Sequence, residues 1–223
     1  MSARDDILAR VRSKLGVHSP DAERVATAKS YVAARAAGPR PAIAAAPTEL
    51  AARLLAKSQA MASTVERLAS LGDVPAAVVR YLAAQDLPLQ AACWPSLGGL
   101  DWSGAGLAVA ARAANGDDPV GITGCFCAIA ETGTLMLVSG PETAATTSLL
   151  PETHIAVVPV ARIVPAMEEG FALLRAEFGE NLPRAVNFVS GPSRTGDIEQ
   201  TIVLGAHGPY RVHLLLIEDA GRS

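Results

Sequence analysis

The chain has 223 residues, of which half are hydrophobic, 18% are charged and only 4% are aromatic, with a formal net charge of −3. This length suits one large α/β domain or a domain with an arm, and the apolar fraction excludes a wholly disordered chain. The slight acidity argues against a nucleic-acid-binding or anionic-membrane-binding surface. No apolar run is long enough to span a bilayer, and the N-terminus lacks the apolar centre of a signal peptide. We therefore expect a cytoplasmic protein.

The N-terminal region is predicted to form a helical arm. Residues 5–15 place Ile7, Leu8, Val11 and Leu15 on one helix face, with acidic residues in the first turn. A second helical stretch is expected from 21 to about 37, and a Pro- and Gly-containing linker follows. The sequence thus predicts an arm and linker over residues 1–47 and a domain over residues 48–223.

Helical and strand patterns alternate along the predicted domain, which favours an α/β fold with a mainly parallel sheet flanked by helices. The expected helices cover residues 49–61, 74–84, 146–150 and 166–178, and a small helix is expected at 124–130. The expected strands cover residues 63–68, 89–94, 135–138, 154–158, 186–189 and 212–217.

Two of these apolar runs end in Ser-Gly-Pro, at residues 139–141 and 190–192. Short runs rich in Val and Leu are typical of strands that are buried on both faces. In an open parallel sheet, ligands bind beyond the carboxyl ends of the strands. We therefore expect both turns to lie at the same carboxyl edge, with the functional site beside them.

The residues after the second Ser-Gly-Pro turn suit a small anion. Glycine lets backbone N–H groups face a ligand, hydroxyl groups add donors, and a guanidinium matches a carboxylate or phosphate. A helix expected to begin near Asp197 would point its positive end at the same place. The alternative, that Thr195 or Asp197 only caps this helix, stays open. The predicted ligand-binding residues are Ser190, Gly191, Ser193, Arg194, Thr195 and Glu199.

Three ionisable residues form the predicted catalytic set, Glu131, Asp197 and His207. A histidine in a Gly-rich turn can exchange protons near neutral pH, and Glu131 could act as a base or nucleophile. The alternatives are that His207 is only a structural donor and that Glu131 only accepts hydrogen bonds from its own loop. His154 and His213 are expected to be packing residues.

The three cysteines, Cys93, Cys125 and Cys127, do not have the spacing of a zinc or iron–sulfur ligand set. They are interpreted as small buried residues. No metal and no cofactor are therefore expected in this chain.

Five segments in matching order resemble the LUD-domain family: 121–124, 128–134, 150–155, 190–199 and 205–209. The resemblance implies a fold like that of the NagB/RpiA/CoA-transferase group. It also implies a role in bacterial L-lactate oxidation to pyruvate, beside partner subunits that carry iron–sulfur clusters. The segment from Gly124 to Cys127 departs from the family pattern.

The leading hypothesis is a non-redox component of a lactate-oxidising system that binds a small carboxylate or a partner protein. One alternative is a free-standing acyl-transfer or CoA-transferase-like enzyme that uses Glu131. A further alternative is an assembly subunit without a working site. No nucleic-acid partner is expected, and a homo-oligomer is compatible with the sequence.

Overall fold

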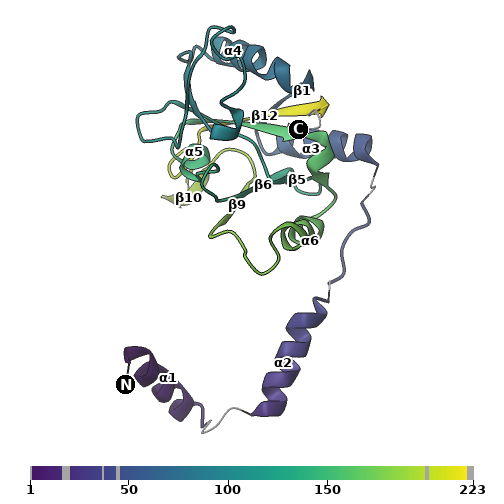
Figure 1. The fold of residues 1–223 in the computed structure, drawn as a ribbon, viewed down its shortest axis with the longest axis vertical. Coiled ribbons are helices and arrows are strands. Elements are labelled where there is room, and N and C mark those ends of the chain that lie inside the picture. Colours follow the sequence, from purple (N-terminus) through teal and green to yellow (C-terminus); the bar gives the residue numbers. More distant parts are fainter. Residues whose placement is uncertain (1, 17–20, 37, 44–45, 199–200, 220–223) are drawn as a thin grey trace. The chain divides into compact units, whose positions relative to one another are not determined.

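The chain forms two compact units, residues 1–41 and 42–223. The computed structural model describes residues 2–16, 21–36, 38–43, 46–198 and 201–219 (Figure 1). The first unit contains two helices, α1 (Ala3–Lys14) and α2 (Ala22–Ala34), which confirms the predicted N-terminal helices. The second unit contains the other helices and all described strands.

Local caps define the two N-terminal helices. The backbone N–H of Asp5 donates to Ser2 Oγ, and the Asp5 carboxylate accepts from the Ser2 backbone, which makes a capping box. The Asp21 carboxylate accepts from the backbone N–H groups of Glu23 and Arg24 at the start of α2. Neither helix has a buried residue.

The centre of the second unit is a six-stranded sheet in the order β1-β12-β7-β4-β2-β3. Every neighbouring pair in it is parallel, which confirms the predicted α/β fold with a parallel sheet. The final apolar run forms β12 between β1 and β7, where its residues 212–217 are buried. The strands are β1 (Thr64–Ser70), β2 (Gln90–Cys93), β3 (Ala108–Ala111), β4 (Val120–Thr123), β7 (Thr153–Pro159) and β12 (Arg211–Asp219).

A second, four-stranded sheet has the order β8-β5-β6-β9. In this sheet β6 is antiparallel to both β5 and β9, and β5 is parallel to β8. Its strands are β5 (Cys127–Ile129), β6 (Thr134–Val138), β8 (Ile163–Val164) and β9 (Val186–Val189).

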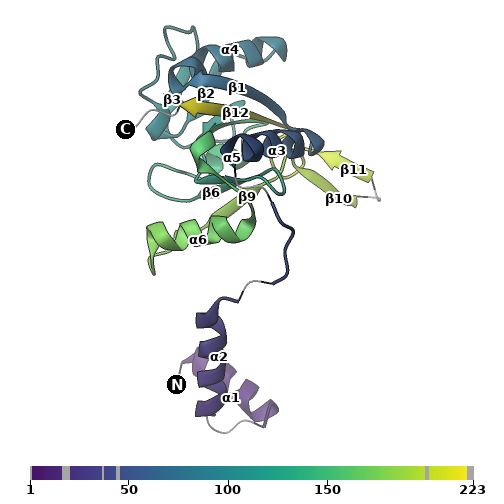
Figure 2. The same cartoon turned by 90° about the vertical axis from the view of Figure 1, so that its right-hand side faces the viewer.

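Three apolar clusters hold these layers together. Helix α4 (Val74–Ala84) packs on one face of the parallel sheet. Helix α3 (Pro47–Ala60) and the second sheet pack on the other face. Helix α6 (Met167–Phe178) covers the far side of the second sheet. Figure 2 shows α4 and α6 on opposite sides of the strands.

The remaining elements are short. They are η1 (Leu71–Asp73), η2 (Pro95–Leu97), α5 (Thr146–Leu149), η3 (Val160–Arg162), β10 (Arg194–Ile198) and β11 (Thr201–Leu204). Strands β10 and β11 form a separate antiparallel hairpin. Within the described ranges, no helix combines the length and apolar character that crossing a membrane requires.

Two predicted helices are wrong. The segment expected as a small helix at 124–130 contains β5, because its residues pair with β6 and β8. The helix expected to begin near Asp197 is instead the hairpin strand β10. Thr195, Ile198, Thr201 and Val203 are β-branched and favour extended backbone, which local helix reasoning did not weigh.

The two Ser-Gly-Pro turns do not share an edge, contrary to the sequence-based expectation. Their strands, β6 and β9, are neighbours in the second sheet and run antiparallel, with Leu135 opposite Val189 and Val138 opposite Val186. The carboxyl ends of antiparallel strands point in opposite directions. The two turns therefore lie at opposite ends of the same strand pair.

Candidate functional site

The last turn of α3 brings two of the predicted motifs together. A Cβ at Gly133 would lie 2.7 Å from the backbone of Lys57 and Ser58, and a Cβ at Gly191 would lie 2.3 Å from Met61 O. Both glycines also have positive φ, at +71° and +77°. Only glycine combines this backbone conformation with so close an approach. The loop after β5 and the loop after β9 thus contact the same end of one helix.

A chain of three hydroxyl groups links these loops. Thr134 Oγ1 lies 2.7 Å from Thr132 Oγ1 and 2.7 Å from Ser190 Oγ. Thr134 is only 3% exposed, whereas Thr132 and Ser190 are exposed. Each hydroxyl can donate one hydrogen bond and accept others. The exposed hydroxyl groups at the two ends, those of Thr132 and Ser190, can therefore hydrogen-bond to a ligand oxygen at the surface.

Glu131 directly precedes Thr132, the first residue of this row of hydroxyl groups. Its backbone N–H donates to Pro165 O at 2.9 Å, and the residue is half-buried. Ser58, which is fully buried, supports the same turn, because its Oγ donates to Gly133 O at 3.4 Å. The turn that carries the Glu131 carboxylate is therefore held by two hydrogen bonds, one to Pro165 and one from Ser58.

Arg194 also contacts the end of α3. Its Nη2 donates to Met61 O at 3.3 Å. Carbonyl groups at a helix C-terminus lack intrahelical partners and carry partial negative charge, so a guanidinium is favourable there. Arg194 thus has a structural role at α3, and its remaining N–H groups are the part available to an anion.

The turn that contains His207 is hydrogen-bonded to Ser193, the residue before Arg194. The Ser193 backbone N–H donates to Pro209 O, and the Gly205 N–H donates to Ser193 O, both at 2.9 Å. His207 is exposed in this turn. The turn directly precedes β12, so it lies at the amino edge of the parallel sheet, and the predicted carboxyl edge is wrong.

The remaining predicted residues lie on or beside β10. Thr195 is half-buried and pairs with Val203 of β11. Asp197 lies on β10, but its side chain and the whole of Glu199 lie outside the described residues. A single pocket that holds Glu131, Asp197 and His207 therefore stays a prediction.

We call the group around the last turn of α3 the α3 cluster; it consists of Glu131, Thr132, Thr134, Ser190, Gly191 and Arg194. Sequence reasoning identified four of these residues but not Thr132 and Thr134, nor the role of α3. In an extended backbone, Thr132 and Thr134 point to the same face because they are two residues apart. This spacing is the feature of the sequence that could have identified them.

His154 and His213 are buried in the parallel sheet, as expected for packing residues. His154 Nε2 shares a hydrogen bond of 2.8 Å with Thr123 Oγ1, and His213 Nδ1 shares one of 2.8 Å with Thr64 Oγ1. The His213 ring stacks on Tyr81, with ring centroids 4.0 Å apart. Burial lowers the pKa of each imidazole to about 4.

All three cysteines are free thiols. Removal from water raises the pKa of Cys93 and Cys127 to about 11 and that of Cys125 to about 12. Across the described residues, no group of three or more His, Cys, Asp or Glu side chains is arranged to hold a metal ion.

These thiols should react slowly in the native protein. At pH 8 only about a thousandth of a thiol with pKa 11 is thiolate, and the thiolate is the nucleophile. We expect less than one thiol to react with Ellman's reagent in native protein and three to react after denaturation. Rapid native labelling of Cys93 or Cys127, located by mass spectrometry, would contradict their burial.

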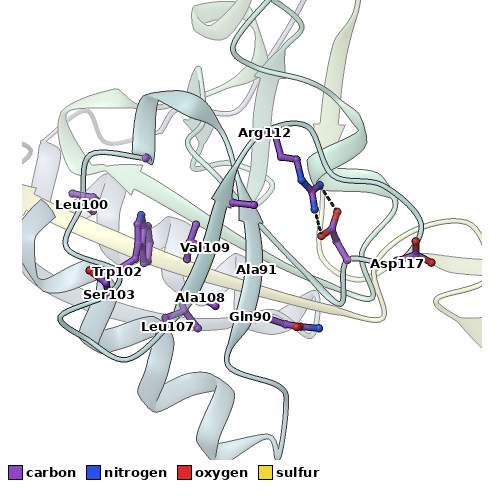
Figure 3. Close-up of a pocket in the computed structure, with 13 residues that line it drawn as sticks. Gln90, Ala91, Leu100, Trp102, Ser103, Leu107, Ala108, Val109, Arg112 and Asp117 are labelled. Carbon is purple, nitrogen blue, oxygen red and sulfur yellow. Dashed lines mark hydrogen bonds and ion pairs between the residues drawn. The ribbon is translucent and has the colours of Figure 1, made fainter.

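A hollow of about 750 Å³ lies along the edge strand β3 (Figure 3). Gln90, Trp102, Ser103 and Asp117 line it, together with the ion pair between Arg112 and Asp118. The two hydrogen bonds of this pair, at 2.7 and 2.9 Å, lower the pKa of Asp118. The charges of Arg112 and Asp118 offset each other, so Asp117 leaves the lining with one net negative charge. None of the residues lining this hollow belongs to the predicted site.

Comparisons with known proteins place the chain among LUD proteins. The family model described as "LUD domain" matches residues 100–217. Lactate utilization protein C 1 of Bacillus mycoides (strain KBAB4) is 43% identical over 102 residues, which cover 45% of this chain and 44% of that protein. Lactate utilization protein C of Bacillus subtilis (strain 168) is 39% identical over 102 residues, covering 45% and 42%. The aligned stretch is thus less than half the length of each relative.

The fold also has a solved counterpart. A crystal structure of a DUF162 family protein from Deinococcus radiodurans superposes with a TM-score of 0.58 and 22% sequence identity. It covers 78% of this chain and 99% of that one, which shows a shared fold. Because the LUD model matches more than half of the residues, the chain belongs to the LUD domain family.

Proposed function

We propose that this chain is a non-redox component of a bacterial L-lactate utilization system, which oxidises lactate to pyruvate together with iron–sulfur partner subunits. The observation that carries this proposal is the similarity, at about 40% identity over 102 residues, to proteins named lactate utilization protein C. The aligned length is enough for a domain, and the α3 cluster supplies a surface with suitable chemistry.

The α3 cluster suits a small 2-hydroxy carboxylate or a carboxylate side chain of a partner. The N–H groups of Arg194 that do not contact Met61 can donate to carboxylate oxygens. The hydroxyl chain of Thr132, Thr134 and Ser190 can donate to, or accept from, a ligand hydroxyl. These two kinds of group recognise the two ends of such a ligand.

The electrons are assigned to the partner subunits. Oxidising a 2-hydroxy acid removes two electrons, and cofactors carry that chemistry because side chains do not accept electron pairs reversibly. The sequence shows no recognisable nucleotide-binding loop and no cluster-ligand spacing. The role proposed for this chain is therefore to bind and position.

Reconstitution tests this function. The purified chain should not oxidise L-lactate with a dye acceptor, whereas the mixture with its iron–sulfur partners should do so. Ser190→Ala and Thr134→Val should lower the reconstituted activity about tenfold each, since each breaks the chain of hydroxyl groups proposed to bind the ligand hydroxyl. Turnover by this chain alone would refute the non-redox role.

A matched control uses the other Ser-Gly-Pro turn. Ser139 Oγ accepts from the Ala185 backbone N–H at 2.9 Å, at the opposite end of the β6–β9 pair. Ser139→Ala should therefore lower stability slightly and leave activity per folded molecule unchanged. Equal losses of activity in the Ser139 and Ser190 variants would remove the α3 cluster from the function.

Glu131 distinguishes the competing function, acyl transfer. A carboxylate nucleophile would attack the carbonyl carbon of a CoA thioester, expel the CoA thiolate and form a mixed anhydride. Hydroxylamine would attack the glutamyl carbonyl of this anhydride, leave a hydroxamate on the residue and release the acyl group as its carboxylate. We expect no trapped adduct and only a modest effect of Glu131→Gln on lactate oxidation. An adduct that maps to Glu131 and disappears in Glu131→Gln would support the acyl-transfer enzyme instead.

A further inference from the structure

Strand β3 forms one edge of the six-stranded sheet, and among the described strands it pairs with β2 alone. The Ala108 backbone N–H donates to Leu89 O, on the side of β2. In a parallel pair, every second residue of a strand bonds to the same neighbour, so the N–H and C=O groups of Val109 and Ala111 point away from β2. The outer edge of β3 thus presents two donors and two acceptors in a row.

The two edges of this sheet differ in how they are protected. Strand β1, at the opposite edge, carries Glu66 and Arg67, which form ion pairs with Arg80 and Glu218. Long charged side chains on an edge strand hinder its pairing with a further strand. Strand β3 has the sequence Ala-Val-Ala-Ala, without a charged side chain or a proline. Of the two edges, β3 is therefore the one at which a further strand can pair.

We call the hollow of about 750 Å³ beside this strand the β3 hollow. Ala108, Val109 and Ala110 all line it, although neighbouring residues of a strand point to opposite faces. The β3 hollow therefore follows the edge of the strand and is not confined to one face of the sheet. Leu100 and Trp102, from the loop before β3, form its other wall (Figure 3). Because the side chains of β3 are small, the hollow has room for those of an added strand.

The charged groups of the β3 hollow indicate what kind of strand fits. The Asp118 carboxylate accepts from the Arg112 guanidinium and from the Asn115 backbone N–H, so it is already engaged within the chain. Asp117 is exposed, and its charge is not offset by this pair. A Lys or Arg side chain would be favourable beside Asp117. Gln90 adds an exposed amide to the lining, which can hydrogen-bond to a backbone or a side chain.

We propose that β3 accepts an extended segment of a partner protein as an added strand, with a Lys or Arg of that segment beside Asp117. The backbone groups of Val109 and Ala111 would provide affinity, and the β3 hollow would receive alternate side chains of the segment. A second copy that pairs through its own β3 fits less well, because its Ala and Val side chains are small and bring no basic group to Asp117. No lining residue belongs to the α3 cluster, so this surface is independent of the proposed function.

Binding of model peptides to the full-length chain tests strand addition. The probes are fluorescein-labelled hexapeptides of alternating Val and Thr in which one Lys occupies each position in turn. The best of them should bind with a Kd below about 1 mM by fluorescence anisotropy, and at saturation it should slow amide hydrogen exchange of Val109 and Ala111 about tenfold. Ala108 and Ala110 belong to the ladder with β2 and are the internal control. Failure of every peptide to bind at about 1 mM, or unchanged exchange at Val109 and Ala111, would overturn the proposal.

Two variants separate backbone pairing from charge. Ala111→Pro removes an outward N–H without touching the ladder with β2 and should weaken binding of the best peptide about fivefold. Asp117→Lys should weaken it about threefold and reverse its preference over the same peptide with Glu in place of Lys.

Controls on both partners complete the test. Glu180→Lys makes the same charge change at an exposed residue outside the β3 hollow and should leave binding unchanged. The peptide with a methyl group on every backbone nitrogen should bind more than about tenfold more weakly. Equal binding of the methylated and unmethylated peptides would refute backbone pairing. A dimer of the unchanged chain that Ala111→Pro converts to a monomer would overturn the proposal in favour of a second copy.

Discussion

Gly191→Ala is expected to destabilise the second unit by about 3–5 kcal/mol, among the largest effects of a single added methyl group. The added Cβ would lie 2.3 Å from Met61 O, and the residue would keep a φ of +77°. Met61 follows directly after α3, whose Leu50, Ala51 and Leu54 are buried in the apolar core, so the backbone there cannot move freely. Gly133→Ala should act similarly, because its Cβ would lie 2.7 Å from the backbone of Lys57 and Ser58. Denaturant unfolding followed by circular dichroism measures both.

Two other glycines separate the causes of this loss. Gly106 has a φ of +82° but nothing within 4 Å of its Cβ position, so Gly106→Ala should cost only backbone strain, about 1–2 kcal/mol. Gly196 has neither a positive φ nor a close neighbour, and its Ala variant should be nearly neutral. If Gly191→Ala costs no more than Gly106→Ala, the close contact between α3 and the loop after β9 is wrong.

Much of the fold follows from local patterns. The apolar runs at 154–158, 186–189 and 212–217 are strands within one or two residues of their predicted bounds, and α6 ends at Phe178 before Gly179 as expected. Such runs are recognisable because burial on both faces, or on one helix face, leaves a period in the sequence. The alternation of helices and strands was also sufficient for the parallel sheet.

The division into two sheets could not be predicted in the same way. The runs at 135–138 and 186–189 are as apolar as those of the parallel sheet, yet they form an antiparallel pair in the second sheet. Partner choice depends on contacts between distant residues, which a single apolar run does not encode. Strand β5 is only three residues long, Cys127–Ile129, so its period was too short to distinguish it from a helix.

Several residues of the candidate site could be predicted from the sequence, but their contacts with α3 could not. Ser190, Gly191 and Arg194 were found because polar groups cluster after an apolar run. Their contacts with α3 were not, since Arg194 bonds to Met61 at a separation of 133 residues. The positive φ of Gly133 and Gly191 explains why these motifs contain glycine, and it is visible only once α3 lies against them.

Acidification from pH 6.5 to pH 4 is expected to remove about 3 kcal/mol of stability for each of the two buried histidines, His154 and His213. Burial lowers the pKa of both from 6.5 to about 4 in the folded chain. Above pH 6.5 both imidazoles are neutral in the folded and unfolded states, so stability is unaffected. Between 6.5 and 4 the unfolded chain binds two protons that the folded chain does not, and stability falls as the pH falls. Below pH 4 both states are protonated, so this contribution falls no further.

Variants at these two positions isolate the effect from that of the carboxylates. His154→Gln can keep a hydrogen bond to Thr123, and His213→Phe can keep the ring stacked on Tyr81, but neither side chain titrates. The double variant should be less stable at pH 7, since Thr64 loses its hydrogen bond to His213. Its stability should change much less from pH 6.5 to 4 than that of the unchanged protein. Chemical denaturation at half-unit steps of pH gives both curves. If stability falls equally with pH in the variant and in the unchanged protein, the two histidines have the same pKa in the folded chain as in the unfolded chain. The burial of the imidazoles in the parallel sheet would then be wrong.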